Sequence, residues 1–256
     1  MADREKMAAF ERIFKTMAEN LRNFKDQLSI VEETDTSNTN FNPQQFWEKT
    51  LQIADKLGYE TNKITILWIS DPLPTPEDMH SVCGSLEIAC VALMNMFHSY
   101  PSAQGRMVKS KLKNGVGDIL DNCSRFTAVL LNSIGVKYNK DSHPLVSECG
   151  MVTAECERLN QLPRDNRSAC ILYLRAEANI IKDALREIEE ARTNEGFLDE
   201  FECDESWTEA DNLIIQPLLG MIKTSGALTK KTLDAVKELK DEDQTKFDDV
   251  IHQFSR

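Results

Sequence analysis

The apolar residues of this chain recur at steps of three and four residues over six long stretches, which is the spacing of an amphipathic helix. The clearest stretch spans residues 4–29, with apolar positions at Met7, Phe10, Phe14, Met17, Leu21, Phe24 and Leu28. The other five cover about residues 43–68, 76–97, 105–134, 145–159 and 167–191. No segment alternates apolar and polar residues as a half-buried strand does. The pattern therefore predicts an all-α fold, an up-and-down helical bundle of long antiparallel helices.

The helical pattern is interrupted once by a long acidic stretch. Between Glu189 and Asp211 the chain carries ten acidic residues and a single arginine. Such composition is typical of a flexible linker. We therefore predict an N-terminal helical bundle over 1–192, an acidic linker over 193–208, and further helices over 209–256. Those last helices either pack back on the first bundle or begin a second bundle that is incomplete in this chain.

The helix expected at 167–191 has more apolar residues than one buried face needs. One set forms a regular seam at Ile171, Leu174, Ala178, Ile181, Leu185 and Ile188. A second set lies beside it at Cys170, Leu172, Tyr173, Ala176, Ile180 and Ala184. The second set indicates either a central helix packed on several neighbours or an exposed binding face. We favour the core interpretation for most of these side chains.

The charge of the chain limits its partners. Forty-two acidic and 30 basic residues give a formal net charge of -12. This balance argues against a surface that neutralises phosphates, so we expect no direct nucleic-acid binding. No apolar run approaches the roughly 20 residues of a membrane helix, and the first residues lack the apolar core of a signal peptide. We expect an intracellular protein that does not insert into a membrane.

Residue types that carry chemistry do not form a recognisable site. The seven cysteines include no CxxC pair and are expected to be reduced, buried thiols. The four histidines have no catalytic context, and Glu77 with His80 gives a single ExxH pair where a di-iron bundle uses two. No glycine-rich phosphate loop is present. We therefore predict no enzyme activity, no catalytic, cofactor-binding or metal-binding residue, and no cofactor.

A short acidic context surrounds Ser206, with Glu209 three residues after it. It is similar to an acid-directed phosphorylation site, but an unmodified linker serine is the default interpretation.

Several segments together resemble a known family. In order along the chain they are FNPQQFWEKTLQIA (41–54), DPLPTPEDMHSVCG (71–84), LPRDNRSACILYL (162–174), KDALREIEEA (182–191) and SWTEADNLIIQPLLGMIKTSGALTKK (206–231). Their order and spacing resemble those of the cyclin-D-binding protein family, also described as Maid-like or Id-like helix-loop-helix interaction proteins. LPRDN followed by the apolar helix is the most specific part.

This resemblance implies a non-enzymatic negative regulator of cell-cycle progression and transcription. It implies binding to D-type cyclins and helix-loop-helix factors, in the cytoplasm and nucleus, and two helical bundles joined by an acidic linker. The segment 145–191 matches the family's helix-loop-helix-like region. The partner contacts expected in this region are Arg164, Asp165, Leu172, Tyr173, Ala176 and Ile180. Family members continue beyond the point that matches Arg256, so we expect the second bundle to be incomplete.

Two other classes of function fit a bundle of long helices. The first is a cytoskeletal or adhesion adaptor of the vinculin or catenin type. The second is a bundle enzyme with a metal or cofactor. Cytoskeletal or adhesion partners, with no cyclin or helix-loop-helix protein, would favour the adaptor, and stoichiometric iron or zinc would favour the enzyme.

Overall fold

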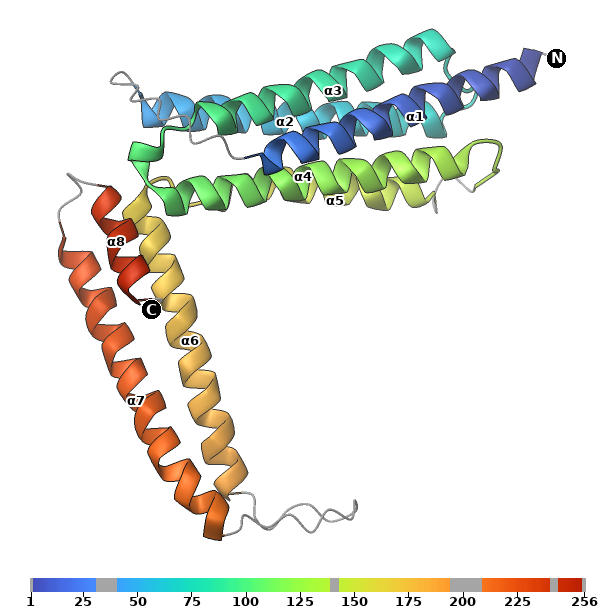
Figure 1. Ribbon diagram of the computed structural model, residues 1–256. Coiled ribbons are helices and arrows are strands. Elements are labelled where there is room, and N and C mark those ends of the chain that lie inside the picture. Colours follow the sequence, from blue (N-terminus) through green and yellow to red (C-terminus); the bar gives the residue numbers. More distant parts are fainter. Residues whose placement is uncertain (1, 31–40, 139–142, 194–208, 240–243, 255–256) are drawn as a thin grey trace. The chain divides into compact units, whose positions relative to one another are not determined.

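The chain folds into helices. The computed structural model describes residues 2–30, 41–138, 143–193, 209–239 and 244–254 (Figure 1), and within these ranges all regular structure is helical. The all-α prediction is confirmed. The chain divides into two compact units, Met1–Arg164 (unit 1) and Asp165–Arg256 (unit 2).

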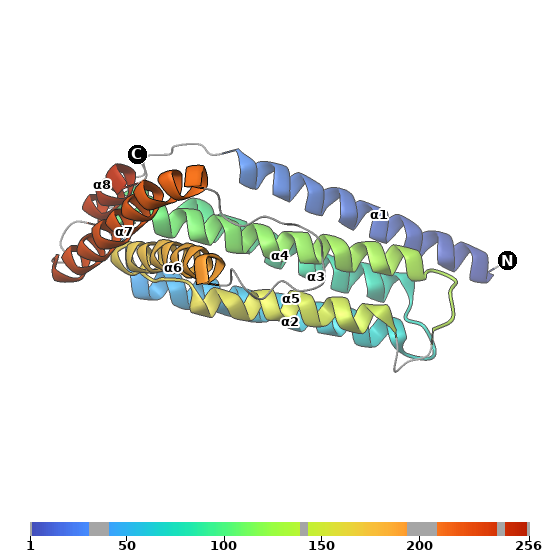
Figure 2. The same ribbon diagram turned by 90° about the horizontal axis from the view of Figure 1, so that it is seen from below.

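Unit 1 is a bundle of five long helices. They are α1 (Ala2–Ser29), α2 (Pro43–Ile69), α3 (Pro76–Ser99), α4 (Arg106–Ser133) and α5 (Pro144–Arg158), with short 3-10 turns at Ser102–Gln104 and Leu159–Gln161. Consecutive helices run in alternating directions (Figure 1), and the five lie side by side in both views (Figure 2). α1 packs on α3 and α4, α2 packs on α3 and α5, and α4 packs on α5. The five helices therefore surround one core.

The helix starts follow from local sequence. Prolines 43, 76 and 144 occupy the first turns of α2, α3 and α5, where a missing N–H removes no helical bond. Asn42 and Thr75 precede two of these helices and accept hydrogen bonds from the backbone N–H groups of Gln45 and Asp78, each at 3.1 Å. Asparagine and threonine are residue types that favour this capping position, because their side-chain oxygens accept from free N–H groups of the first turn.

An aromatic cluster fills one part of the unit 1 core. Phe10 and Phe14 of α1 each meet Trp68 of α2 edge-on, with ring centroids 5.1 Å apart. The indole N–H of Trp68 donates to the hydroxyl of Ser133 in α4, at 2.7 Å. The regular apolar seam of the first helix is therefore part of the core of this bundle. Edge-on ring contacts and a hydrogen-bonded indole N–H both stabilise buried aromatic side chains.

Among the described helices, α3 has the length and apolar composition that would allow it to cross a membrane. The sequence pattern did not indicate such a run. In the structure α3 packs on α1, α2 and α4, and residues such as Met79, Leu86, Cys90 and Leu93 are buried in the core. Its apolar character is that of a core helix.

Unit 2 contains α6 (Asn166–Thr193), α7 (Glu209–Glu238) and α8 (Thr245–Phe254). α7 and α8 both pack on α6. The side chain of Arg167 at the start of α6 donates to the carbonyl of Val236 near the end of α7, at 3.3 Å, so α6 and α7 run antiparallel (Figure 1).

The boundary between the units differs from the predicted one. The sequence-based division assigned residues up to 192 to the first bundle, whereas α6 belongs to unit 2. The boundary differs because the apolar seam of α6 packs on α7. Ile181 of α6 lies against Gly226 of α7, where an added Cβ would be only 3.2 Å from the Ile181 side chain. Most of the predicted linker, residues 194–208, lies outside the described residues, as does Ser206.

Candidate functional site

α6 buries one of its two apolar sets against its neighbours. Leu174 is fully buried, and Ile171, Ala178, Ile181, Leu185 and Ile188 are half-buried. The predicted seam is therefore confirmed.

The second apolar set of α6 is largely uncovered. Cys170 is fully buried and Tyr173 is half-buried, but Leu172 is 46% exposed and Ile180 is 62% exposed. Ala176 is also exposed. The core interpretation therefore holds for Cys170, and it is wrong for Leu172, Ala176 and Ile180.

α7 carries a matching stripe of exposed apolar residues. Ile214, Leu218, Met221 and Leu228 are separated by four, three and seven residues, so they lie on one face of the helix. All four are exposed, Met221 to 68%. A neighbouring face of α7 is buried through Ile215, Leu219, Thr229 and Val236.

The two stripes lie on the same side of the α6–α7 pair. An ion pair of 3.5 Å between Glu189 of α6 and Lys223 of α7 marks one side. A helix turns about 100° per residue, so Ile180 and Met221 each point away from that side. We call the resulting surface the open face. It consists of Tyr173, Ala176, Ile180, Ile214, Leu218, Met221 and Leu228.

α8 covers one end of the same side. Asn166 and Cys170 precede Tyr173 at steps of four and three, so these α6 residues lie in one line. The Asn166 amide donates to the Gln244 carbonyl (2.7 Å) and to the Asp248 carboxylate (2.9 Å), which attaches the start of α8 to the start of α6. Phe247 of α8 is buried. Figure 1 shows α8 beside the first part of α6, so the later turns of α6 and the open face extend beyond it.

The remaining predicted contact residues have structural partners. The Arg164 guanidinium lies 4.8 Å from the ring centroid of Trp47, and its carbonyl accepts from the Trp47 indole N–H at 3.1 Å. The Asp165 carboxylate accepts from the backbone N–H of Ser168 at 2.7 Å, so it caps α6. The structure thus brings together Tyr173, Ala176 and Ile180 but not Arg164, Asp165 and Leu172. A role of any of the six in partner contact stays a prediction.

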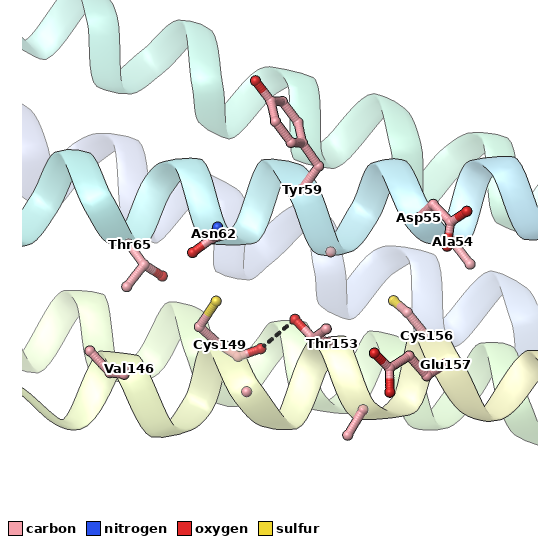
Figure 3. A pocket seen from close by; sticks show the side chains of 13 residues that line it. Ala54, Asp55, Tyr59, Asn62, Thr65, Val146, Cys149, Thr153, Cys156 and Glu157 are labelled. Atoms are coloured by element: carbon pink, nitrogen blue, oxygen red, sulfur yellow. Dashed lines mark hydrogen bonds between the residues drawn. The ribbon is translucent and has the colours of Figure 1, made fainter.

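A concave feature lies in unit 1 between α2 and α5 (Figure 3). It is a hollow of about 620 Å³ that exists because small residues line it, among them Ala54, Gly58, Gly150 and Ala154. Its charged lining groups are two carboxylates, Asp55 and Glu157, and no lysine or arginine lines it. Sequence reasoning missed this hollow, although glycines on two neighbouring helices were the available signal. Its lining offers no nucleophile paired with a base.

Burial shifts the pKa of two cysteines and one histidine in unit 1. Burial raises the pKa of the Cys83 and Cys156 thiols to about 12, so both are protonated at neutral pH. The His143 ring accepts from the backbone N–H of Leu145 at the start of α5, and burial lowers the pKa of this histidine. Within the described residues, no group of three or more His, Cys, Asp or Glu side chains is arranged to hold a metal ion.

Comparison with known proteins identifies the family of the chain. Residues 49–194 match the family model described as "Grap2 and cyclin-D-interacting, N-terminal". The chain belongs to this family. The match confirms the resemblance seen in the sequence, and it includes the α6 part of the open face but not α7.

Named relatives in the cyclin-D-interacting family cover most of the chain. The Cyclin-D1-binding protein 1 homolog of Xenopus laevis is 28% identical over 87% of this chain and 69% of its own length. Cyclin-D1-binding protein 1 of Rattus norvegicus is 27% identical, and that of Homo sapiens 26%, each over 92% of this chain and 71% of its own length. The match therefore spans both units.

Proposed function

We propose that this chain is a non-enzymatic regulator that binds D-type cyclins and helix-loop-helix factors through the open face and represses their activity. It acts by mass action: a bound partner is withheld from its activating complex. The proposal places this activity in the cytoplasm and nucleus and links it to cell-cycle progression and transcription.

The open face is the observation that carries the proposal. Large exposed apolar patches are uncommon on monomers and mark interaction sites. Here two adjacent helices expose apolar stripes side by side, including Ile180 and Met221, in a family described as cyclin-D-interacting. The hollow between α2 and α5 offers a weaker alternative, because several of its lining residues are small and its charged groups are the carboxylates of Asp55 and Glu157.

Binding and repression are tested separately with purified proteins. Isothermal titration of the chain with a D-type cyclin, and with a helix-loop-helix domain, measures association. A kinase assay of the cyclin with its catalytic partner, with the chain added in excess, measures repression. Saturable binding together with falling kinase activity supports the proposal. No binding to either class of partner contradicts it, and binding without inhibition removes the repressive part.

A further inference from the structure

Most basic residues of the α6–α7 pair lie away from the open face; Lys231, which follows Leu228 by three residues, lies at its outer edge. On α6, Arg175, Lys182 and Arg186 precede Glu189 at steps of seven, four and three, so they share its side. On α7, Lys230 and Lys237 follow Lys223 at steps of seven and lie on the same flank. The Glu189–Lys223 ion pair shows that this flank is opposite to Ile180 and Met221.

Two carboxylates of α6 lie on the open-face side. Glu177 falls between Tyr173 and Ile180 at steps of four and three, and Glu187 follows Ile180 by seven. Within the described residues, no lysine or arginine pairs with Glu177 or Glu187, whereas Asp183 and Glu190 both lie within 4 Å of Arg186. The open face therefore combines apolar residues with acidic charge that the described part of the chain leaves without a cation.

α8 is an example of a helix that packs on the open-face side of α6. It is a short amphipathic helix that turns Phe247, Val250, Ile251 and Phe254 inward, at steps of three and four. Its 10 residues extend only about 15 Å, against about 42 Å for the 28 residues of α6. The uncovered part of the face has the length for a further helix of about 15 residues, at about 1.5 Å per residue.

Charge distinguishes between possible occupants. A second copy of this chain, related by a two-fold axis, would bring Glu177 and Glu187 of both copies into one interface. Unpaired carboxylates in such an interface disfavour association, and the net charge of -12 adds to the repulsion. A helix with lysine or arginine beside its apolar stripe would pair with these carboxylates.

We propose that the open face binds an amphipathic helix of a partner protein whose apolar stripe is flanked by lysine or arginine. This assignment rests on the proposed function, and it names the chemistry of the partner at the same surface. The apolar stripe packs between α6 and α7 next to α8, and the basic flank faces Glu177 and Glu187. Amphipathic helices bind apolar surfaces in this way, with anchor residues at steps of three and four.

Two synthetic helical peptides of equal length and with the same leucine stripe provide the probe. One carries lysines beside the stripe and the other carries glutamates, and fluorescence anisotropy measures their binding to the full chain. We expect the lysine peptide to bind at least about tenfold more tightly, which corresponds to about 1.4 kcal/mol. The double variant Glu177→Lys with Glu187→Lys should weaken the lysine peptide and strengthen the glutamate peptide.

A matched control separates specific pairing from the general attraction of a cation to an acidic protein. Glu19→Lys with Asp26→Lys changes the net charge equally, at exposed positions of α1. Equal effects of the two double variants, or equal binding of the two peptides, would overturn the assignment. So would a dimer in sedimentation experiments that Met221→Asp converts to a monomer, because a second copy would then occupy the face.

The outcomes also separate this assignment from the proposed function. If the chain binds a D-type cyclin or a helix-loop-helix domain but neither peptide, the function stands and the partner chemistry is wrong. If it binds the lysine peptide with the expected charge dependence but neither protein, the surface assignment stands and the proposed partners are wrong.

Discussion

Ile181 of α6 packs directly against Gly226 of α7 in the seam between these two helices. A Cβ built on Gly226 would lie 3.2 Å from Ile181 Cγ2, which is tighter than ordinary contact. Glycine at this position therefore allows the two helices to pack. The close approach fixes which faces of α6 and α7 are buried, and so it also fixes which stripes remain on the open face.

Replacing Gly226 by leucine should destabilise unit 2. The larger side chain would have to displace Ile181, and overpacking of this kind costs about 1–3 kcal/mol. Gly220 is the matched control, since a Cβ there meets nothing within 4 Å. Gly220→Leu should stabilise the helix by up to about 1 kcal/mol, the difference in helix propensity. Urea unfolding curves measure both; a stable Gly226→Leu protein would contradict the described packing.

Charging α6 should distinguish its two apolar sets. Leu174→Glu places a carboxylate at a fully buried position, and we expect a loss of at least about 3 kcal/mol of unfolding free energy. Ile180→Glu, at a position 62% exposed, should change it by less than about 0.5 kcal/mol. Thermal melts followed by circular dichroism provide the comparison. Equal destabilisation by both variants would show that Ile180 is a core residue.

Asn166 should control the attachment of α8. Its amide is buried and donates to the Gln244 carbonyl and the Asp248 carboxylate. Asn166→Ala removes both donations, and we expect a loss of about 1–3 kcal/mol. Hydrogen exchange should then speed up in α8 while it is unchanged in α2 and α3. An unchanged exchange rate in α8 would mean that Phe247 and its apolar neighbours hold this helix by themselves.

The buried thiols should make stability depend on pH at the alkaline end. Folding raises the pKa of Cys83 and Cys156 from 9.0 to about 12, because burial disfavours the thiolate. Below pH 9 both states hold these protons. Between pH 9 and 12 the unfolded state loses them first, so the folded state loses stability as pH rises.

Alkylation mapped by mass spectrometry checks the same groups at pH 8. Cys83 and Cys156 should be protected in the folded chain and modified in urea, because only the thiolate reacts and the folded chain holds both thiols protonated and buried. Serine variants at both positions should lose part of the stability difference between pH 8 and pH 10.5. Rapid modification of the folded chain at either position would contradict its burial.

Much of the fold could be predicted from the sequence because local signals determine it. Asn42, Thr75 and the prolines that follow them set helix starts, and the seam of the first helix correctly identified Phe10 and Phe14 as core residues. These signals act within a few residues, so they require no knowledge of the neighbours in space.

The partners of the helices could not be predicted in the same way. Periodicity shows that α6 has a buried seam, but it does not show that Gly226 of α7 provides the surface against which Ile181 packs. The unit boundary differed from the prediction for this reason. The exposure of Ile180 could not be predicted from the sequence either. An apolar side chain is exposed only when no other element covers it, and periodicity does not show which elements are neighbours.

The most direct test of the central claim is the affinity for a D-type cyclin after two charges are placed on the open face. Ile180→Asp with Met221→Asp changes exposed residues on α6 and α7, while Ile88→Asp changes a residue of unit 1 that is 67% exposed, close to the 68% of Met221. Titration calorimetry should show at least about a hundredfold loss of affinity for the double variant, or about 2.7 kcal/mol. Ile88→Asp should bind like the unmodified chain. Undiminished cyclin binding by a folded double variant would show that the open face is not the binding surface.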